Sequence, residues 1–176
     1  MIELSTIRDL VAIFGVIIGL TYYIMNLRNQ SKARQIQLVN QISKTTTREL
    51  QMEGIELLRM TWTDYDDFEN KFGSDNNPEN FGIRYEWWSM FNQTGLLLRE
   101  GLLSMDMLTK VLGGTQGALW HWDKFGDIIK RQREVYNLPD LFVDFEYYAD
   151  EIVRYQKRKG YSTDIPENYD SYSKST

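Results

Sequence analysis

The chain has 176 residues, carries a net charge of −5 and contains no cysteine. Its basic residues do not gather into one long run, which argues against broad nucleic-acid binding, because that activity needs a positive surface. The lack of cysteine excludes disulfides and thiolate metal sites, and it fits a domain that faces the cytosol. The length accommodates one domain with its own hydrophobic core and some additional segments.

An uncharged apolar run near the N-terminus is the most informative segment. A helix that crosses a bilayer needs about 20 mostly apolar residues, and soluble helices rarely contain such a block. Residues 1–28 are therefore predicted to form a transmembrane anchor. A cleavable signal peptide fits less well, because its first segment should be basic and a small-residue cleavage site should follow. A buried core helix is the soluble alternative. The predicted span consists of Leu10, Val11, Ala12, Ile13, Phe14, Gly15, Val16, Ile17, Ile18, Gly19, Leu20, Thr21, Tyr22, Tyr23, Ile24 and Met25.

The charges on the two sides of this span predict its orientation. Arg8 is the only basic side chain before it, whereas Arg28, Lys32 and Arg34 follow closely. Basic residues accumulate on the cytoplasmic side of membrane helices. We therefore expect a single-pass protein of the cell membrane with its N-terminus outside and its C-terminal domain in the cytoplasm.

Gly15 and Gly19 form a Gly-x-x-x-Gly pattern within the span. This spacing lets two membrane helices approach closely, so the pair is a candidate for helix pairing. The alternative is that glycine is simply common in membrane helices.

The remainder of the chain predicts helices only, since no convincing alternation of apolar and polar residues is present. Residues 29–47 are expected to form a juxtamembrane helical stalk, residues 48–159 a helical bundle and residues 160–176 a disordered tail. The fold class is therefore all-α: an N-terminal transmembrane helix and stalk followed by a cytoplasmic helical bundle. Within the bundle, caps and apolar periodicity predict helices over about 48–60, 64–72, 78–100, 104–112, 115–136 and 141–159.

Two features inside these helices carry structural predictions. Gly95 lowers helix propensity but allows another helix to come close. Arginines lie among aromatic residues, where pairing with Glu86, Glu100 or Asp144 is favoured over anion binding. These arginines are Arg84, Arg99, Arg131 and Arg133.

His121 is the only histidine and lies between Trp120 and Trp122. A histidine can act as an acid or base near neutral pH, but it needs an orienting carboxylate and a substrate within reach. Adjacent side chains on a helix point in different directions, so this triplet builds no cage. A structural histidine at the helix surface or the edge of the core is the favoured interpretation.

Two further motifs fail their tests. The acidic group that starts at Asp64 does not match a calcium loop, because Glu69 stands where the sharp glycine turn is needed and Asp75 where the last glutamate is needed. The segment from Gly113 to Gly117 lacks the Gly-Lys-Ser/Thr ending of a phosphate loop and follows a helix instead of a strand. The sequence thus predicts no catalytic residue, no cofactor-binding residue and no metal site.

The five tryptophans and many other aromatic residues are expected to lie mostly in the core, with some left for a functional surface. A ligand-sensing pocket among them is one hypothesis. Its candidate residues, which also serve as a candidate partner surface, are Trp88, Arg99, His121 and Trp122.

Several segments carry a family resemblance, from Leu57 to Trp62, from Asp67 to Phe72 and from Phe91 to Leu102. Trp122, Arg133, Pro139 and the triplet Phe145-Glu146-Tyr147 complete the pattern. The chain resembles an uncharacterised prokaryotic family of single-pass, membrane-anchored helical proteins that is grouped under a domain of unknown function. The resemblance implies the helical fold and the anchor, and it implies no activity or catalytic residue.

We therefore expect a membrane-tethered helical interaction or scaffold domain that is not an enzyme. Its expected partners are the lipid bilayer and another membrane or cytoplasmic protein, or a second copy of the chain, and not nucleic acid. The alternatives are the ligand-sensing domain and, less favoured, an enzyme that uses His121 and carboxylates.

Overall fold

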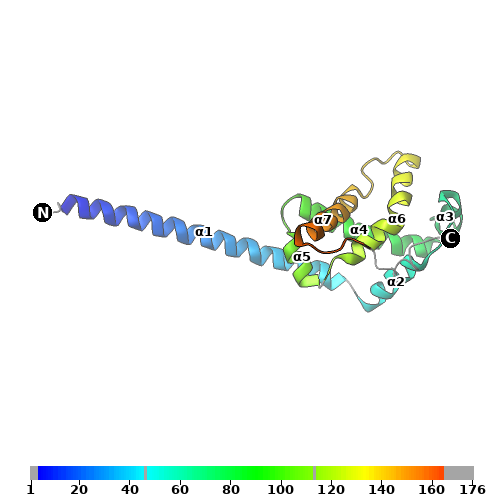
Figure 1. Cartoon of the computed structure of the whole chain (residues 1–176), viewed down its shortest axis with the longest axis horizontal. Coiled ribbons are helices and arrows are strands. Elements are labelled where there is room, and N and C mark those ends of the chain that lie inside the picture. The colour runs from blue at the N-terminus through cyan, green and yellow to red at the C-terminus, as the bar shows by residue number, and fades with distance from the viewer. Residues whose placement is uncertain (1–3, 46, 113, 165–176) are drawn as a thin grey trace. The chain divides into compact units, whose positions relative to one another are not determined.

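The computed structural model describes residues 4–45, 47–112 and 114–164, and the regular structure in these ranges is entirely α-helical (Figure 1). This confirms the predicted all-α class, while the cytoplasmic placement stays a prediction. The helices are α1 (Leu4–Thr45), α2 (Arg48–Arg59), α3 (Tyr65–Phe72), α4 (Pro78–Arg99), α5 (Met105–Leu112), α6 (Gln116–Val135) and α7 (Val143–Lys159).

α1 is one continuous helix through both the predicted anchor and the predicted stalk. By its contacts the chain divides into two compact units, Met1–Gln37 and Leu38–Thr176. The last turns of α1 belong to the second unit, where Val39 is fully buried and Leu38 and Ile42 pack against the core. The bundle therefore begins about ten residues before Arg48, because apolar side chains at the end of the expected stalk are part of its core.

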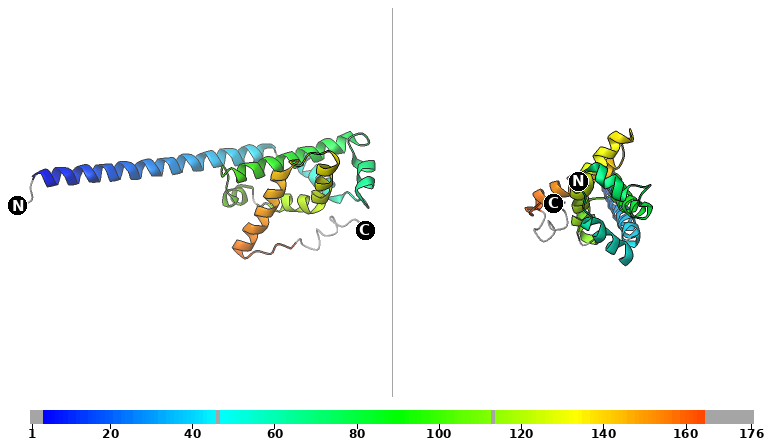
Figure 2. Two further views of the ribbon diagram at one scale, coloured as in Figure 1. Left: turned by 90° about the horizontal axis from the view of Figure 1, so that it is seen from above. Right: turned by 90° about the vertical axis from the view of Figure 1, so that its right-hand side faces the viewer.

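The bundle core is built around α4, α6 and α7, and Figure 2 shows α7 crossing α4 at a steep angle. The largest fully buried apolar side chains come from these helices and from α1, α2, α3 and α5, and burying each of them stabilises the fold by about 1.5–3 kcal/mol. They include Trp88 of α4, Phe125 and Ile129 of α6, and Phe145 and Ile152 of α7.

Local capping chemistry explains where most of the bundle helices begin and end. The amide of Leu50 donates to the hydroxyl of Thr47 (3.2 Å), and the amide of Asp67 donates to the carboxylate of Asp64 (2.8 Å). α4 starts with Pro78, whose missing N–H is not needed in a first turn. Gly160 ends α7 with a φ of 72°, which suits glycine. The observed bounds therefore agree with the predicted ranges to within two residues.

α7 is the helix whose start differs most from the expectation. It begins at Val143, two residues after the predicted Leu141, because Phe142 has a left-handed φ of 51°. Of the predicted tail, Gly160 to Asp164 are described and contain no helix, whereas residues 165–176 lie outside the described residues.

Candidate functional surfaces

α1 carries a long apolar surface that nothing in its own unit covers. Every large apolar side chain from Val11 to Leu27 is exposed by at least 44%, and Tyr22 reaches 72%. The helix contains an 18-residue window with a mean hydropathy of 1.6, none of which is buried. Its length and composition therefore suffice for one membrane span, although a signal sequence has the same properties.

Gly15 and Gly19 lie on this helix, and a Cβ added at either position would meet nothing within 4 Å. No other described part of the chain covers the helix face that these two glycines form. Whether it pairs with a second membrane helix stays a prediction.

Trp88 and His121, two of the four predicted pocket residues, lie in the core. The ring of Trp88 packs against those of Phe125 (5.4 Å between centroids) and Phe142 (5.7 Å), and only 2% of the residue is exposed. His121 is 3% exposed and stacks on Trp87 at 5.0 Å with an interplanar angle of 14°. Both side chains therefore serve packing.

The electrostatics of His121 follow from this burial. Its Nδ1 lies 2.8 Å from the carbonyl oxygen of Gly117, which can only accept, so Nδ1 carries the proton of the neutral ring. Nε2 is buried and makes no hydrogen bond to the described residues. Desolvation by burial lowers the pKa of His121 to about 4, against the backbone groups of Gly117 and Gly54, which raise it. The ring is therefore neutral at physiological pH.

Arg99 and Trp122 lie elsewhere on the bundle. Arg99 is exposed and pairs with Asp144 at 2.8 Å, as expected, and its guanidinium lies 5.1 Å from the ring of Tyr147. Trp122 is half-buried and meets the ring of Phe145 edge-on at 5.1 Å. Three hollows of the bundle, with volumes of 640, 470 and 350 Å³, are lined by none of the four predicted residues. The structure thus does not gather these residues around one of these hollows.

Arg84 is a buried cation. The sequence alone did not predict its surroundings. Only 1% of it is exposed, and its guanidinium lies 4.6 Å from the ring of Phe68 and 5.2 Å from that of Trp88. Its Nε donates to Asn80 Oδ1 (2.8 Å) and its Nη2 to the carbonyl of Phe72. Burial lowers the pKa of Arg84 to about 10, while the charge of Glu69 raises it.

The expected carboxylate pairing is therefore wrong for Arg84, because backbone and amide oxygens take its hydrogen bonds. The other three arginines do pair with carboxylates, but only Arg99 uses one of the expected partners, Asp144. Arg133 binds Glu146 at 2.6 Å and Arg131 binds Glu134 at 2.7 Å.

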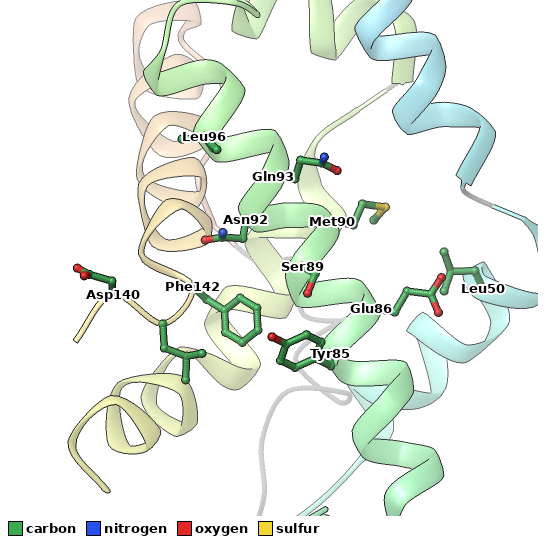
Figure 3. Close-up of a pocket in the computed structure, with 11 residues that line it drawn as sticks. Leu50, Tyr85, Glu86, Ser89, Met90, Asn92, Gln93, Leu96, Asp140 and Phe142 are labelled. Carbon is green, nitrogen blue, oxygen red and sulfur yellow. The ribbon is translucent and has the colours of Figure 1, made fainter. Parts of the chain in front are cut away.

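The 640 Å³ hollow is a groove along α4 (Figure 3). Tyr85 and Phe142 of its lining point toward each other, with ring centroids 5.3 Å apart. Glu86 lies on the side of α2 and Asp140 on the opposite side. The groove is lined by Leu50, Tyr85, Glu86, Ser89, Met90, Asn92, Gln93, Leu96, Asp140, Leu141 and Phe142.

Asn92 connects this groove to the start of α7. Phe142, the residue before the helix, offers no side-chain cap. Instead, Oδ1 of Asn92 accepts hydrogen bonds from the amides of Asp144 (3.0 Å) and Phe145 (3.1 Å). The amide of Asp144 is thereby satisfied by a side chain from another helix, while the amide of Phe145 also donates to the carbonyl of Phe142 at 3.2 Å.

The groove has a mixed chemical character. Tyr85 and Leu96 are 49% and 44% exposed and supply apolar surface, while Ser89, Asn92 and Gln93 supply polar groups. The charged lining residues are Glu86 and Asp140, both acidic. Among the described residues, no group of three or more His, Asp or Glu side chains is arranged to hold a metal ion.

Comparison with known proteins identifies a protein family that includes this chain. A family model described as "Domain of unknown function (DUF4760)" matches residues 9–152. This confirms the resemblance to an uncharacterised family, whereas its prokaryotic and membrane-anchored character stays an expectation. No curated protein and no solved structure matches the chain.

Proposed function

The chain belongs to the DUF4760 family, whose model runs through both the apolar helix and the bundle, and from this premise we propose that it is a membrane-tethered helical interaction domain. The single observation that carries the proposal is the exposed apolar surface of α1. An apolar surface of this length is unfavourable in water and is covered in a bilayer. The tether would raise the effective concentration of the bundle for partners at the same membrane.

Cell fractionation tests the tether. Val16→Lys with Ile17→Asp places two charges in the middle of the span, at a cost of about 2.5–3.5 kcal/mol each. We expect the wild type to stay in the membrane fraction after extraction at high salt and alkaline pH, and the double variant to leave it. Gln30→Asp with Gln35→Lys introduces the same side chains after the span and should change nothing. A wild type that is fully extracted would contradict the proposal.

We further propose that the N-terminus lies outside the cell membrane and the bundle in the cytoplasm. The absence of native cysteine makes each introduced cysteine the only thiol of the chain. In intact cells, a membrane-impermeant maleimide should label Ser5→Cys, whereas Ser74→Cys, in an exposed loop, should be labelled only after lysis. The opposite labelling pattern would reverse the orientation.

For the bundle we propose recruitment of a partner segment in the groove along α4. Its two acidic side chains, Glu86 and Asp140, favour a segment that combines an apolar residue with a lysine or arginine. A photoreactive residue at Gln93, which is exposed in the groove, should cross-link such a segment in native membranes. The same residue at Glu79, exposed on α4 but outside the groove lining, is the control.

The cross-linked peptide decides the outcome of this experiment. We expect the cross-linked peptide to contain a lysine or an arginine. We also expect the adduct to be lost in the Glu86→Lys variant. The peptide sequence also distinguishes another protein from a second copy of this chain. An adduct that persists in Glu86→Lys, or that forms equally from position 79, would contradict recruitment by this groove.

Pairing of membrane helices through Gly15 and Gly19 is a separate proposal. Gly15→Leu with Gly19→Leu should abolish any dimer seen by cross-linking in membranes, because leucine prevents close helix approach. An unchanged dimer would place the contact elsewhere.

We propose no catalytic role. The burial of His121 against Trp87 supports this, because a general acid or base must come within hydrogen-bond reach of its substrate.

A further inference from the structure

The part of α1 that directly follows the apolar run carries three cations within seven residues. They are Arg28, Lys32 and Arg34, and all three are exposed. The residues between them are asparagine, glutamine, serine and alanine, so this stretch contains no negative charge. We call residues 28–34 the basic segment. Its charge is opposite in sign to that of the whole chain, which is −5.

No acidic side chain of α1 lies near the basic segment. Between Asp9 and Glu49 the sequence contains neither aspartate nor glutamate. α1 is continuous from Asp9 to Arg28, so these two residues lie about 28 Å apart along the helix axis. This distance exceeds the screening length of about 8 Å at physiological salt. None of the ion pairs among the described residues involves the three cations, whose charge is therefore available to an anion from outside the chain.

The spacing of the cations matches the depth of a lipid headgroup layer. The helix rise puts the Cα of Lys32 about 6 Å and that of Arg34 about 9 Å beyond the Cα of Arg28. Helical side chains lean toward the N-terminus of their helix, which here is the direction of the apolar run. The headgroup layer of one leaflet is about 5–8 Å thick, and long basic side chains extend toward it. All three cations can thus reach headgroups when the apolar run spans the bilayer.

The cations also surround the helix instead of forming one narrow face. Successive residues of a helix are rotated by about 100°, which puts Arg28 and Lys32 about 40° apart and Arg34 about 160° from Lys32. A protein or peptide partner would cover one side of α1. Lipid headgroups meet a spanning helix on every side, so this arrangement favours lipids as the anionic partner.

We infer that the basic segment gathers lipids with a net negative headgroup around α1 in preference to zwitterionic lipids. The inference rests on the proposed membrane tether and adds the class of lipid that surrounds it. Each basic residue close to an anionic surface contributes a preference of about fivefold.

Fluorescence quenching tests this inference with the full-length protein in phosphatidylcholine vesicles. Because the chain has no cysteine, Ala33→Cys, at an exposed position of the basic segment, accepts a single neutral fluorophore. The quenchers are phosphatidylserine and phosphatidylcholine that carry the same nitroxide near the top of one acyl chain. Both lipids contain a phosphodiester, so a difference between them reports the net charge of the headgroup. We expect phosphatidylserine to be enriched at the fluorophore by at least about fivefold, the effect of one cation.

Removal of the three cations should abolish this preference. Arg28→Gln, Lys32→Gln and Arg34→Gln are combined, because glutamine keeps a long polar side chain without the charge. In this triple variant the two quenchers should act equally. A preference for phosphatidylserine that survives in the triple variant would overturn the inference.

The matched control removes the same number of charges from the bundle. Lys110→Gln, Lys157→Gln and Arg158→Gln change exposed cations of α5 and α7. This variant should retain the preference of the wild type. Loss of the preference in it would show that the net charge of the chain, and not the basic segment, selects the lipid.

Quenching by phosphatidylcholine separates this inference from the tether itself. Strong quenching by phosphatidylcholine without a preference for phosphatidylserine would overturn this inference alone. Absence of quenching by either lipid would overturn it together with the membrane tether. Inorganic phosphate, added at constant ionic strength, should leave the preference unchanged. A loss caused by phosphate would show that the cations bind a small free anion instead of a headgroup.

Discussion

Gly95 of α4 and Asp144 of α7 are in direct backbone contact: a Cβ added to Gly95 would lie 1.8 Å from the carbonyl oxygen of Asp144. A backbone carbonyl in the first turn of a helix cannot move aside as a flexible side chain can. The contact thus fixes the distance between two central helices of the bundle. It also confirms the expectation that this glycine permits a close helix approach.

Gly95→Ala should therefore lower the free energy of unfolding by about 3 kcal/mol, at the upper end of the usual cost of overpacking. Gly82→Ala is the matched control in the same helix, because a Cβ there meets nothing within 4 Å. It should stabilise the protein by about 0.5–1 kcal/mol through helix propensity. Thermal unfolding of the full chain in detergent, followed by circular dichroism, measures both. Equal effects of the two substitutions would contradict the close contact.

Asn92 is expected to act as the cap of α7. Asn92→Ala leaves the amide of Asp144 without an acceptor and the amide of Phe145 with the carbonyl of Phe142 alone, so it should cost about 1–2 kcal/mol. Asn92→Asp keeps the oxygen acceptor and adds a negative charge at a helix N-terminus, so it should be much less harmful. Amide hydrogen exchange at Asp144 should accelerate in the alanine variant only. Unchanged exchange in that variant would refute the capping role.

Arg84 is expected to stabilise the bundle through its hydrogen bonds and aromatic contacts. Arg84→Met removes the donors to Asn80 and to the carbonyl of Phe72, and it should lower the free energy of unfolding by about 3 kcal/mol. Arg131→Met removes an exposed ion pair with Glu134 and should cost less than about 0.5 kcal/mol. Urea unfolding of both variants checks the difference. A small effect at both positions would contradict the assigned role of Arg84.

From the lowered pKa of His121 we predict that mild acidification lowers the free energy of unfolding. Because its pKa is about 4 in the folded protein and about 6.5 when unfolded, the unfolded state binds the proton first as the pH falls. The contribution of neutral His121 to the free energy of unfolding is therefore fully present above about pH 6.5. The free energy of unfolding then falls by about 3 kcal/mol as the pH drops to about 4.

The variant His121→Phe keeps a ring against Trp87 and removes this titration. Its stability should stay nearly flat between pH 7 and pH 5, where the wild type loses stability. Asp106→Asn changes an exposed carboxylate and should retain the wild-type slope in this range. Since the chain has one histidine, a wild-type slope in His121→Phe would show that other groups titrate there.

The candidate sites were less predictable than the helices. Trp88, Arg99, His121 and Trp122 share an aromatic setting in the sequence, but their contacts distribute them over the core and the surface. Burial against particular partners decided this, such as Trp87 for His121 and Asp144 for Arg99. One-dimensional spacing contains no information on which of several aromatic residues of a helix meets which neighbour.

By itself, the sequence determined the apolar run from Leu10 to Met25 and the helical class of the rest, because apolar periodicity, N-caps and glycine stops act within a few residues of each other. It also determined the acidic balance and the absence of thiol chemistry, which follow from composition. Only the tertiary structure decided that Asn92 caps α7, that Arg84 is buried among rings and that Val39 belongs to the core. Each of these depends on contacts between segments far apart in the chain, and such contacts are set by the packing of whole helices.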